Sequence, residues 1–183
     1  LKSPSLTDEQ MTQIREIAVG NITSRVLHAF FPRSSGAAGL EKAVQDLCDR
    51  ASEAVADGIH ILILSDRGVT KDLVPIPSLL AVGAVHHHLI REGTRTRVGI
   101  VVETGEAREV MHFCLLMGYG ASAWCPYVAY ETVRGLVRSG VIQNMDEEEA
   151  LAHYRKAVDK GVLKVATKMG ISALQCYHGA QIF

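Results

Sequence analysis

The chain has 183 residues, 48% of them hydrophobic, and its 19 basic and 20 acidic side chains give a formal net charge of −1. This length is sufficient for a hydrophobic core within one domain, and the balanced charge offers no general attraction to nucleic acid or to an anionic membrane. No apolar stretch approaches the ~18 residues of a membrane span, and four scattered cysteines predict a reducing compartment with no zinc or disulfide framework.

The first third of the chain predicts a helix, a strand and a second helix. Thr7 with Gln10 has the spacing of a capping box, which indicates a helix to about Val19. Apolar and β-branched residues over 22–30 are typical of a strand. Residues 34–39 are expected to form a loop. We interpret it as a plain loop and not a phosphate-binding one, because its two glycines lack the Gly-Lys-Ser/Thr ending of a phosphate loop. From residue 40 to about 57, apolar positions recur at helical spacing.

Three apolar runs, over residues 59–64, 98–102 and 121–124, each end in polar residues at a turn. Continuous apolar runs without alternation favour strands that are covered on both faces, as in a parallel sheet. Helices predicted between and after the runs would supply the right-handed crossovers. We expect these helices at 76–91, 107–117, 126–137 and 146–169, with a short final helix at 172–178.

Polar side chains follow the three runs and should therefore meet at one carboxyl edge of the sheet, where α/β proteins place their sites. The candidates are Asp66, Arg67, Glu103, Cys125 and Tyr127. An Arg fork can hold a carboxylate with two hydrogen bonds, so Arg67 is expected to pair there. The pattern leaves open whether this polar edge is a binding site or an inter-domain contact. It assigns no catalytic, cofactor-binding or metal-binding residue, and the triplet His86–His88 is interpreted as structural, since successive helical residues diverge by ~100°.

Longer blocks of sequence carry a resemblance to a known family. They lie at residues 63–69, 75–82, 85–91, 96–98, 101–109, 112–121, 125–127, 161–165, 168–172 and 179–183. In this order and separation they resemble the central domain of the glutamate synthase large subunit, in both its ferredoxin- and NADPH-dependent forms. The resemblance runs from about Leu6 to the last residue. It implies a single α/β domain over residues 1–183. This domain would consist of a parallel sheet with crossover helices and would resemble an incomplete (β/α) barrel. The amino-terminal part of the family's domain would be missing, and a start at Leu1 fits a segment of a longer polypeptide.

The resemblance also implies a function. Glutamate synthase makes L-glutamate from L-glutamine and 2-oxoglutarate, and its central domain would be a scaffold between the glutaminase and FMN-binding domains of the same polypeptide. The segment itself would be non-catalytic, part of it lining the ammonia route. FMN and an iron–sulfur cluster are implied for the full-length enzyme and not for this chain. The compartment would be the cytoplasm, or the plastid of a photosynthetic eukaryote, and the electron donor stays open.

Two alternatives remain beside the scaffold. One is an independent enzyme or small-molecule-binding domain that uses the carboxyl edge. The other is an interaction module whose exposed apolar surface would drive self-association, with candidates at residues 171–183 (Leu174, Tyr177, Ile182, Phe183) and at Tyr127 and Tyr130. Lys164 and Lys168 are taken as solvated, a basic patch for an acidic neighbour being the alternative.

Overall fold

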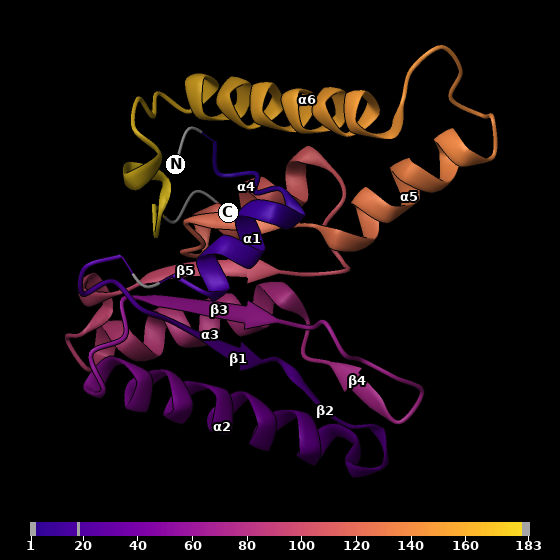
Figure 1. Ribbon diagram of the computed structural model, residues 1–183. Coiled ribbons are helices and arrows are strands. Elements are labelled where there is room, and N and C mark those ends of the chain that lie inside the picture. Colours follow the sequence, from indigo (N-terminus) through magenta and orange to yellow (C-terminus); the bar gives the residue numbers. More distant parts are fainter. Residues whose placement is uncertain (1–2, 18, 181–183) are drawn as a thin grey trace.

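The computed structural model of the chain describes residues 3–17 and 19–180. A sheet of four parallel strands, in the order β1-β3-β5-β6, forms its centre (Figure 1). The strands are β1 (Ser24–His28), β3 (Ile61–Ser65), β5 (Gly99–Glu103) and β6 (Ala123–Cys125). The predicted parallel sheet is therefore confirmed, with each strand shifted or shortened by a few residues.

Helices connect these strands and follow them. They are α1 (Asp8–Arg15), α2 (Gly36–Ala56), α3 (Ser78–Arg91), α4 (Val110–Gly118), α5 (Tyr127–Arg138) and α6 (Glu147–Lys168). The predicted capping box of α1 is present, with the Thr7 side chain accepting from the Gln10 backbone N–H and the Gln10 side chain accepting from that of Thr7. At α6 the Asp146 side chain accepts from the Glu149 N–H, which satisfies one of the free donors of the first turn.

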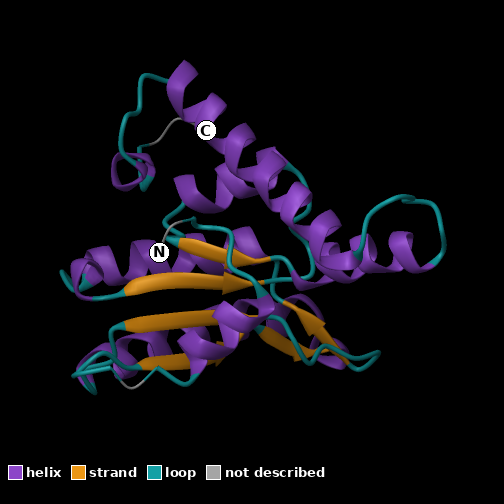
Figure 2. Ribbon diagram, turned by 45° about the horizontal axis from the view of Figure 1, so that its top comes forward, coloured by secondary structure: helices purple, strands orange, loops and turns teal. Residues whose placement is uncertain are grey.

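The sheet separates two hydrophobic cores because side chains alternate along each strand. On one face, Leu62, Leu64, Ile100 and Val102 pack with α2, α3 and α4. On the other, Ile63, Val101 and Ala123 pack beneath Met11 and Ile14 of α1. Figure 2 shows the strands with helices above and below them. Burial on both faces explains why the strands read as unbroken apolar runs.

The segment before α1 extends the sheet beyond β6. The Leu6 N–H donates to the Trp124 carbonyl at 2.8 Å, and the Trp124 N–H donates to the Pro4 carbonyl at 2.9 Å. Ser5 is held between two elements, because its hydroxyl donates to Asp159 of α6 and accepts from the Trp124 indole. Residues 4–6 are thus fixed to both the sheet and α6.

The predicted strand over residues 22–30 is confirmed over 24–28 and wrong at its end. The chain leaves the parallel sheet after His28, and β2 (Phe30–Pro32) pairs antiparallel with β4 (Leu73–Pro75) in a separate two-stranded sheet. The segment between β3 and α3 therefore contains a strand that the sequence analysis did not predict. Each partner has only three residues, too few for a period-2 pattern to be read from sequence.

Other boundaries also differ from expectation. Residues 36–39 are not a loop but the first turn of α2, preceded by a 3₁₀ turn at Arg33–Ser35. Gly36 allows this entry because its φ of +58° suits glycine. Helix α1 ends at Arg15, short of the predicted Val19. The final predicted helix is a 3₁₀ turn at Leu174–Tyr177, and α3 begins after Pro77.

The apolar surface expected for self-association is largely absent from the described residues. Tyr177 and Tyr130 are 0% and 2% exposed, because both rings point into the domain's own cores. Tyr127 and Leu174 are half-buried. The remaining two candidates, Ile182 and Phe183, lie outside the described residues.

His86, the first residue of the histidine triplet on α3, has a structural role. His86 is buried, and its Nδ1 accepts a hydrogen bond of 2.9 Å from Arg95 Nε. The same guanidinium donates to the carbonyls of Val98 and Gly120, which joins the residue before β5 to the loop before β6. Burial and the nearby Arg95 lower the pKa of His86 to about 4, so the ring is neutral in the folded protein at neutral pH.

Candidate functional site

The carboxyl ends of the parallel strands place one residue from each strand in a single row. His28 pairs with Ser65, Ser65 with Glu103, and Glu103 with Cys125. Because the side-chain period along a strand is two, Ser65, Glu103 and Cys125 point to the same face, the one covered by α1. Glu103 and Cys125, two of the predicted residues, therefore lie side by side at one edge of the sheet.

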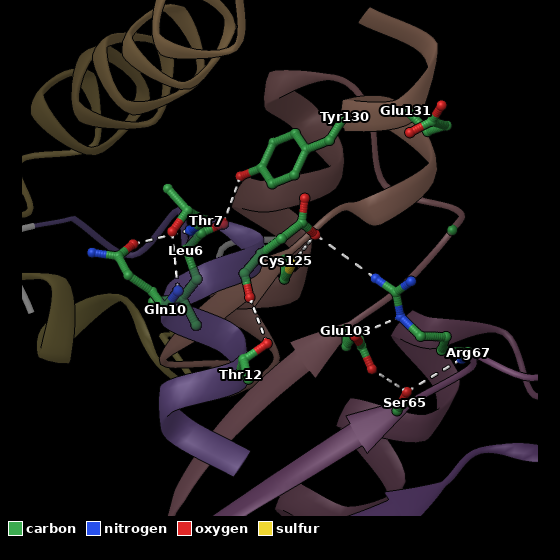
Figure 3. A network of polar contacts seen from close by, with 12 residues as sticks. Leu6, Thr7, Gln10, Thr12, Ser65, Arg67, Glu103, Cys125, Tyr130 and Glu131 are labelled. Atoms are coloured by element: carbon green, nitrogen blue, oxygen red, sulfur yellow. Dashed lines mark hydrogen bonds and ion pairs between the residues drawn. The ribbon is translucent and has the colours of Figure 1, made fainter. Parts of the chain in front are cut away.

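Glu103 is the centre of this edge and is fully buried. Its Oε1 accepts a hydrogen bond of 2.8 Å from Arg67 Nε, and its Oε2 accepts from the Ser65 hydroxyl and from Arg15. Figure 3 shows Arg67 and Ser65 converging on this carboxylate. Burial lowers the pKa of the Arg67 guanidinium, but the hydrogen bond and charge of Glu103 outweigh that effect, so the net pKa is raised. The Arg67 guanidinium therefore stays charged at neutral pH.

Asp66 accepts hydrogen bonds from a second, separate set of donors. Its Oδ2 accepts from the Thr104 hydroxyl at 2.7 Å, and the Gly105 N–H lies 3.0 and 2.9 Å from its two oxygens. Asp66 and Thr104 are both buried. This aspartate joins the turn after β3 to the turn after β5, and it lies apart from the Glu103 ion pairs although the two residues were predicted together.

Tyr127, the first residue of α5, links the two sets. The Arg67 guanidinium lies 4.2 Å from the centre of its ring, within cation–π range. Burial and a hydrogen bond to Asp66 raise the pKa of the Tyr127 phenol. Cys125 lies beneath, fully buried, with its sulfur 3.8 Å from Asp8. Burial and the charges of Asp8 and Glu103 raise the pKa of its thiol to about 12.

Three charged residues of this edge were missed by the sequence reasoning. Asp8 and Arg15 come from α1, and Arg134 comes from α5; Arg134 donates to Asp8 at 2.7 Å. The available signal was a spacing of seven residues, Asp8 to Arg15 and Tyr127 to Arg134, which places both members of each pair on one helix face. That spacing identifies a polar helix face but does not show which other element of the chain the face packs against.

A cleft of about 700 Å³ opens over this edge between α1 and α5. Its charged lining is balanced, with three carboxylates and three guanidinium groups: Asp8, Glu103, Glu131, Arg15, Arg67 and Arg134. No group of three or more His, Cys, Asp and Glu in the described part of the chain is placed to hold a metal ion. The helices described in the structure also include none that is long and apolar enough to cross a bilayer.

Comparisons with known proteins agree on one family. The family profile described as the glutamate synthase central domain matches residues 1–183. The chain is similar to the glutamate synthase [NADPH] large chain of Bacillus subtilis, at 44% identity over its whole length, and to the ferredoxin-dependent glutamate synthase of Pyropia yezoensis, at 43%. It spans about 12% of the length of each of these relatives.

Solved structures resemble the chain in fold. A flavocytochrome b2 variant with benzoylformate superposes with a TM-score of 0.58 at 10% identity, covering 97% of this chain and 38% of that one. A second flavocytochrome b2 variant gives 0.55 at 11% identity, over 96% and 38% of the two chains. With its four parallel strands, the fold corresponds to an incomplete (β/α) barrel, as predicted.

Proposed function

Because the chain belongs to the glutamate synthase central domain family, we propose that it is a non-catalytic scaffold domain of a glutamate synthase. That enzyme makes L-glutamate from L-glutamine and 2-oxoglutarate. The domain would hold the glutaminase and FMN-binding domains of the same polypeptide in place. FMN and the iron–sulfur cluster would be bound outside residues 1–183.

The observation that supports a non-catalytic role is the state of the carboxylates at the polar edge. Both oxygens of Glu103 and both oxygens of Asp66 accept hydrogen bonds from side chains or backbone of the chain itself. A general acid or base must instead reach a proton of the substrate. The Cys125 thiol, with a pKa of about 12, supplies no thiolate nucleophile at neutral pH.

The same contacts suit a domain that fixes the position of others. Arg15 connects α1 to Glu103 at the sheet edge, and Arg134 connects α5 to Asp8 of α1. Ser5 attaches the segment before α1 to α6. A rigid block of this kind would keep two active centres at a constant separation. Part of its surface would line the ammonia route, since a small neutral molecule needs a closed passage and no ligand set.

A second candidate is a small-molecule site in the edge cleft, which the 700 Å³ volume and the Arg67–Tyr127 stack favour. An anionic ligand would have to displace Asp8 or Glu103 from their arginines. The scaffold proposal requires no such rearrangement.

The test is made in the full-length glutamate synthase with Arg134→Met, which breaks the contact between α1 and α5. Coupled turnover consumes glutamine and 2-oxoglutarate in equal amounts, and we expect glutamine hydrolysis to exceed 2-oxoglutarate consumption in this variant. Glutamate formation from added ammonia should stay within about twofold, since the chemistry lies elsewhere. Arg138→Met is the matched control, because Arg138 is exposed and its ion-pair partners among the described residues are Glu131 and Glu147. A loss of ammonia-driven synthesis of tenfold or more at normal flavin content would assign the edge to the chemistry and refute the proposal.

A further inference from the structure

The lysines of this chain are concentrated on one helix. Four of its seven lysines, Lys156, Lys160, Lys164 and Lys168, recur at four-residue spacing along α6. All four are exposed. A step of four residues turns a helix by only ~40°, so these residues form one gently winding row, here called the lysine stripe.

The lysine stripe faces away from the domain. The opposite side of α6 is buried through Leu151, Val158, Val162 and Ala166, and it packs against α4 and α5. Figure 1 shows α6 as an outer layer of the molecule. The stripe is therefore available to a partner without any change in the domain.

The positive charge of the stripe is not neutralised by the domain itself. Between residues 150 and 180 the only acidic residue is Asp159, and both of its carboxylate oxygens accept from Ser3 and Ser5. None of the four stripe lysines forms a salt bridge among the described residues. Like charges four residues apart on a helix repel one another and slightly destabilise it. No salt bridge among the described residues offsets this repulsion.

We propose that the lysine stripe is the docking surface for an acidic face of another part of the same glutamate synthase polypeptide. This inference rests on the proposed function. The chain spans about 12% of its relatives' length, so most of such a polypeptide lies outside it and must pack on some of its surface. Complementary charge is how interfaces select a partner and fix its orientation.

Two other polyanions fit the stripe less well. Nucleic acids are bound through Arg forks and stacked aromatic rings as well as Lys, and Arg155, the arginine of this helix, is turned inward to the Ser5 carbonyl. A membrane-surface helix needs a broad free apolar face. The apolar face of α6 is buried, and its large exposed apolar side chain is Leu163, with Met169 exposed just beyond the helix end.

The experiment measures acetylation rates of individual lysines in the full-length enzyme by mass spectrometry. At low salt the stripe lysines should react about fivefold or more slowly than Lys71, an exposed lysine outside α6. At 0.5 M NaCl the difference should shrink to about twofold, because salt screens the contact. In Lys160→Glu the acetylation rates of Lys156 and Lys164 should rise to that of Lys71. The matched Lys71→Glu should leave the acetylation rates of the stripe lysines unchanged.

A carbodiimide, which joins amines to carboxylates in ion-pair contact, identifies the partner. Cross-links from stripe lysines to Asp or Glu outside residues 1–183 are expected, and mixed isotope-labelled enzyme should place them within one polypeptide. Labelling rates equal to that of Lys71 without such cross-links would overturn the inference. So would cross-links only to a different protein, or salt-sensitive binding of RNA or anionic vesicles that Lys160→Glu abolishes. These results are independent of the coupling ratio that tests the scaffold role.

Discussion

Replacing Glu103 with glutamine tests whether the polar edge stabilises the domain. Glutamine keeps the volume but has one acceptor oxygen, and its amide nitrogen is a donor. Three donors, from Arg15, Ser65 and Arg67, converge on the native carboxylate. Glu103→Gln therefore loses two charge-assisted hydrogen bonds. It also places the glutamine NH2 group next to a side chain that is itself a hydrogen-bond donor.

The size of the stability loss in Glu103→Gln depends on how exposed the two arginine partners are. Removing one partner of a buried ion pair costs ~3–5 kcal/mol, but the Arg15 and Arg67 side chains are 32% and 46% exposed and can be hydrated. We therefore expect a loss of about 2–3 kcal/mol. Urea unfolding followed by circular dichroism measures it, with an unchanged m-value. Glu131→Gln is the control, because the side chain of Glu131 is 59% exposed and its loss should cost less than ~1 kcal/mol. Equal effects of the two substitutions would refute the assignment of Glu103 as the centre of the edge.

Three further changes test other contacts. In Gly120→Ala the new Cβ would lie 2.2 Å from His86 Nδ1 at a φ of +115°. We therefore expect the free energy of unfolding in urea to fall by about 2–4 kcal/mol. Gly93→Ala, where the Cβ would meet open space, should lose about 1 kcal/mol. Because the unfolded chain protonates His86 near pH 6.5 and the folded chain only near pH 4, the free energy of unfolding should fall by up to ~3 kcal/mol as the pH drops through this window; the decline should be smaller in His86→Asn. Tyr130→Phe loses the 2.8 Å bond to the Leu6 carbonyl and should cost about 1–2 kcal/mol by thermal unfolding; no measurable change would show that this bond is dispensable.

The row Ser65–Glu103–Cys125 could be predicted from sequence because each residue directly follows or ends an apolar run. Parallel strands with crossover helices bring their carboxyl ends to one edge, and the register then places equivalent positions side by side. The partners of that row could not be predicted. Arg15 reaches it because α1 packs over this face of the sheet, and Arg134 of α5 bonds Asp8 of α1. A helical spacing shows a polar face without showing its neighbour.

Short elements and burial of single rings were also beyond the sequence. The pairing of Phe30–Pro32 with Leu73–Pro75 involves three residues on each side, so propensity and periodicity have too few positions to act on. Tyr177 lies in a segment with turn-like composition, and its burial is a tertiary property of the core between α3 and α4. The sequence alone therefore suggested an exposed surface that the folded chain covers.

The most direct test of the scaffold role is the activity of a full-length glutamate synthase that carries Tyr127→Phe together with Arg67→Met. These substitutions remove the phenol that bonds Asp66 and the guanidinium that bonds Glu103, and both side chains are at least partly exposed. If the domain is a scaffold, kcat for glutamate formation from ammonia and 2-oxoglutarate should stay within about twofold of the unmodified enzyme. A fall of a hundredfold or more, in protein that retains its fold and flavin, would place the chemistry at this edge and contradict the account.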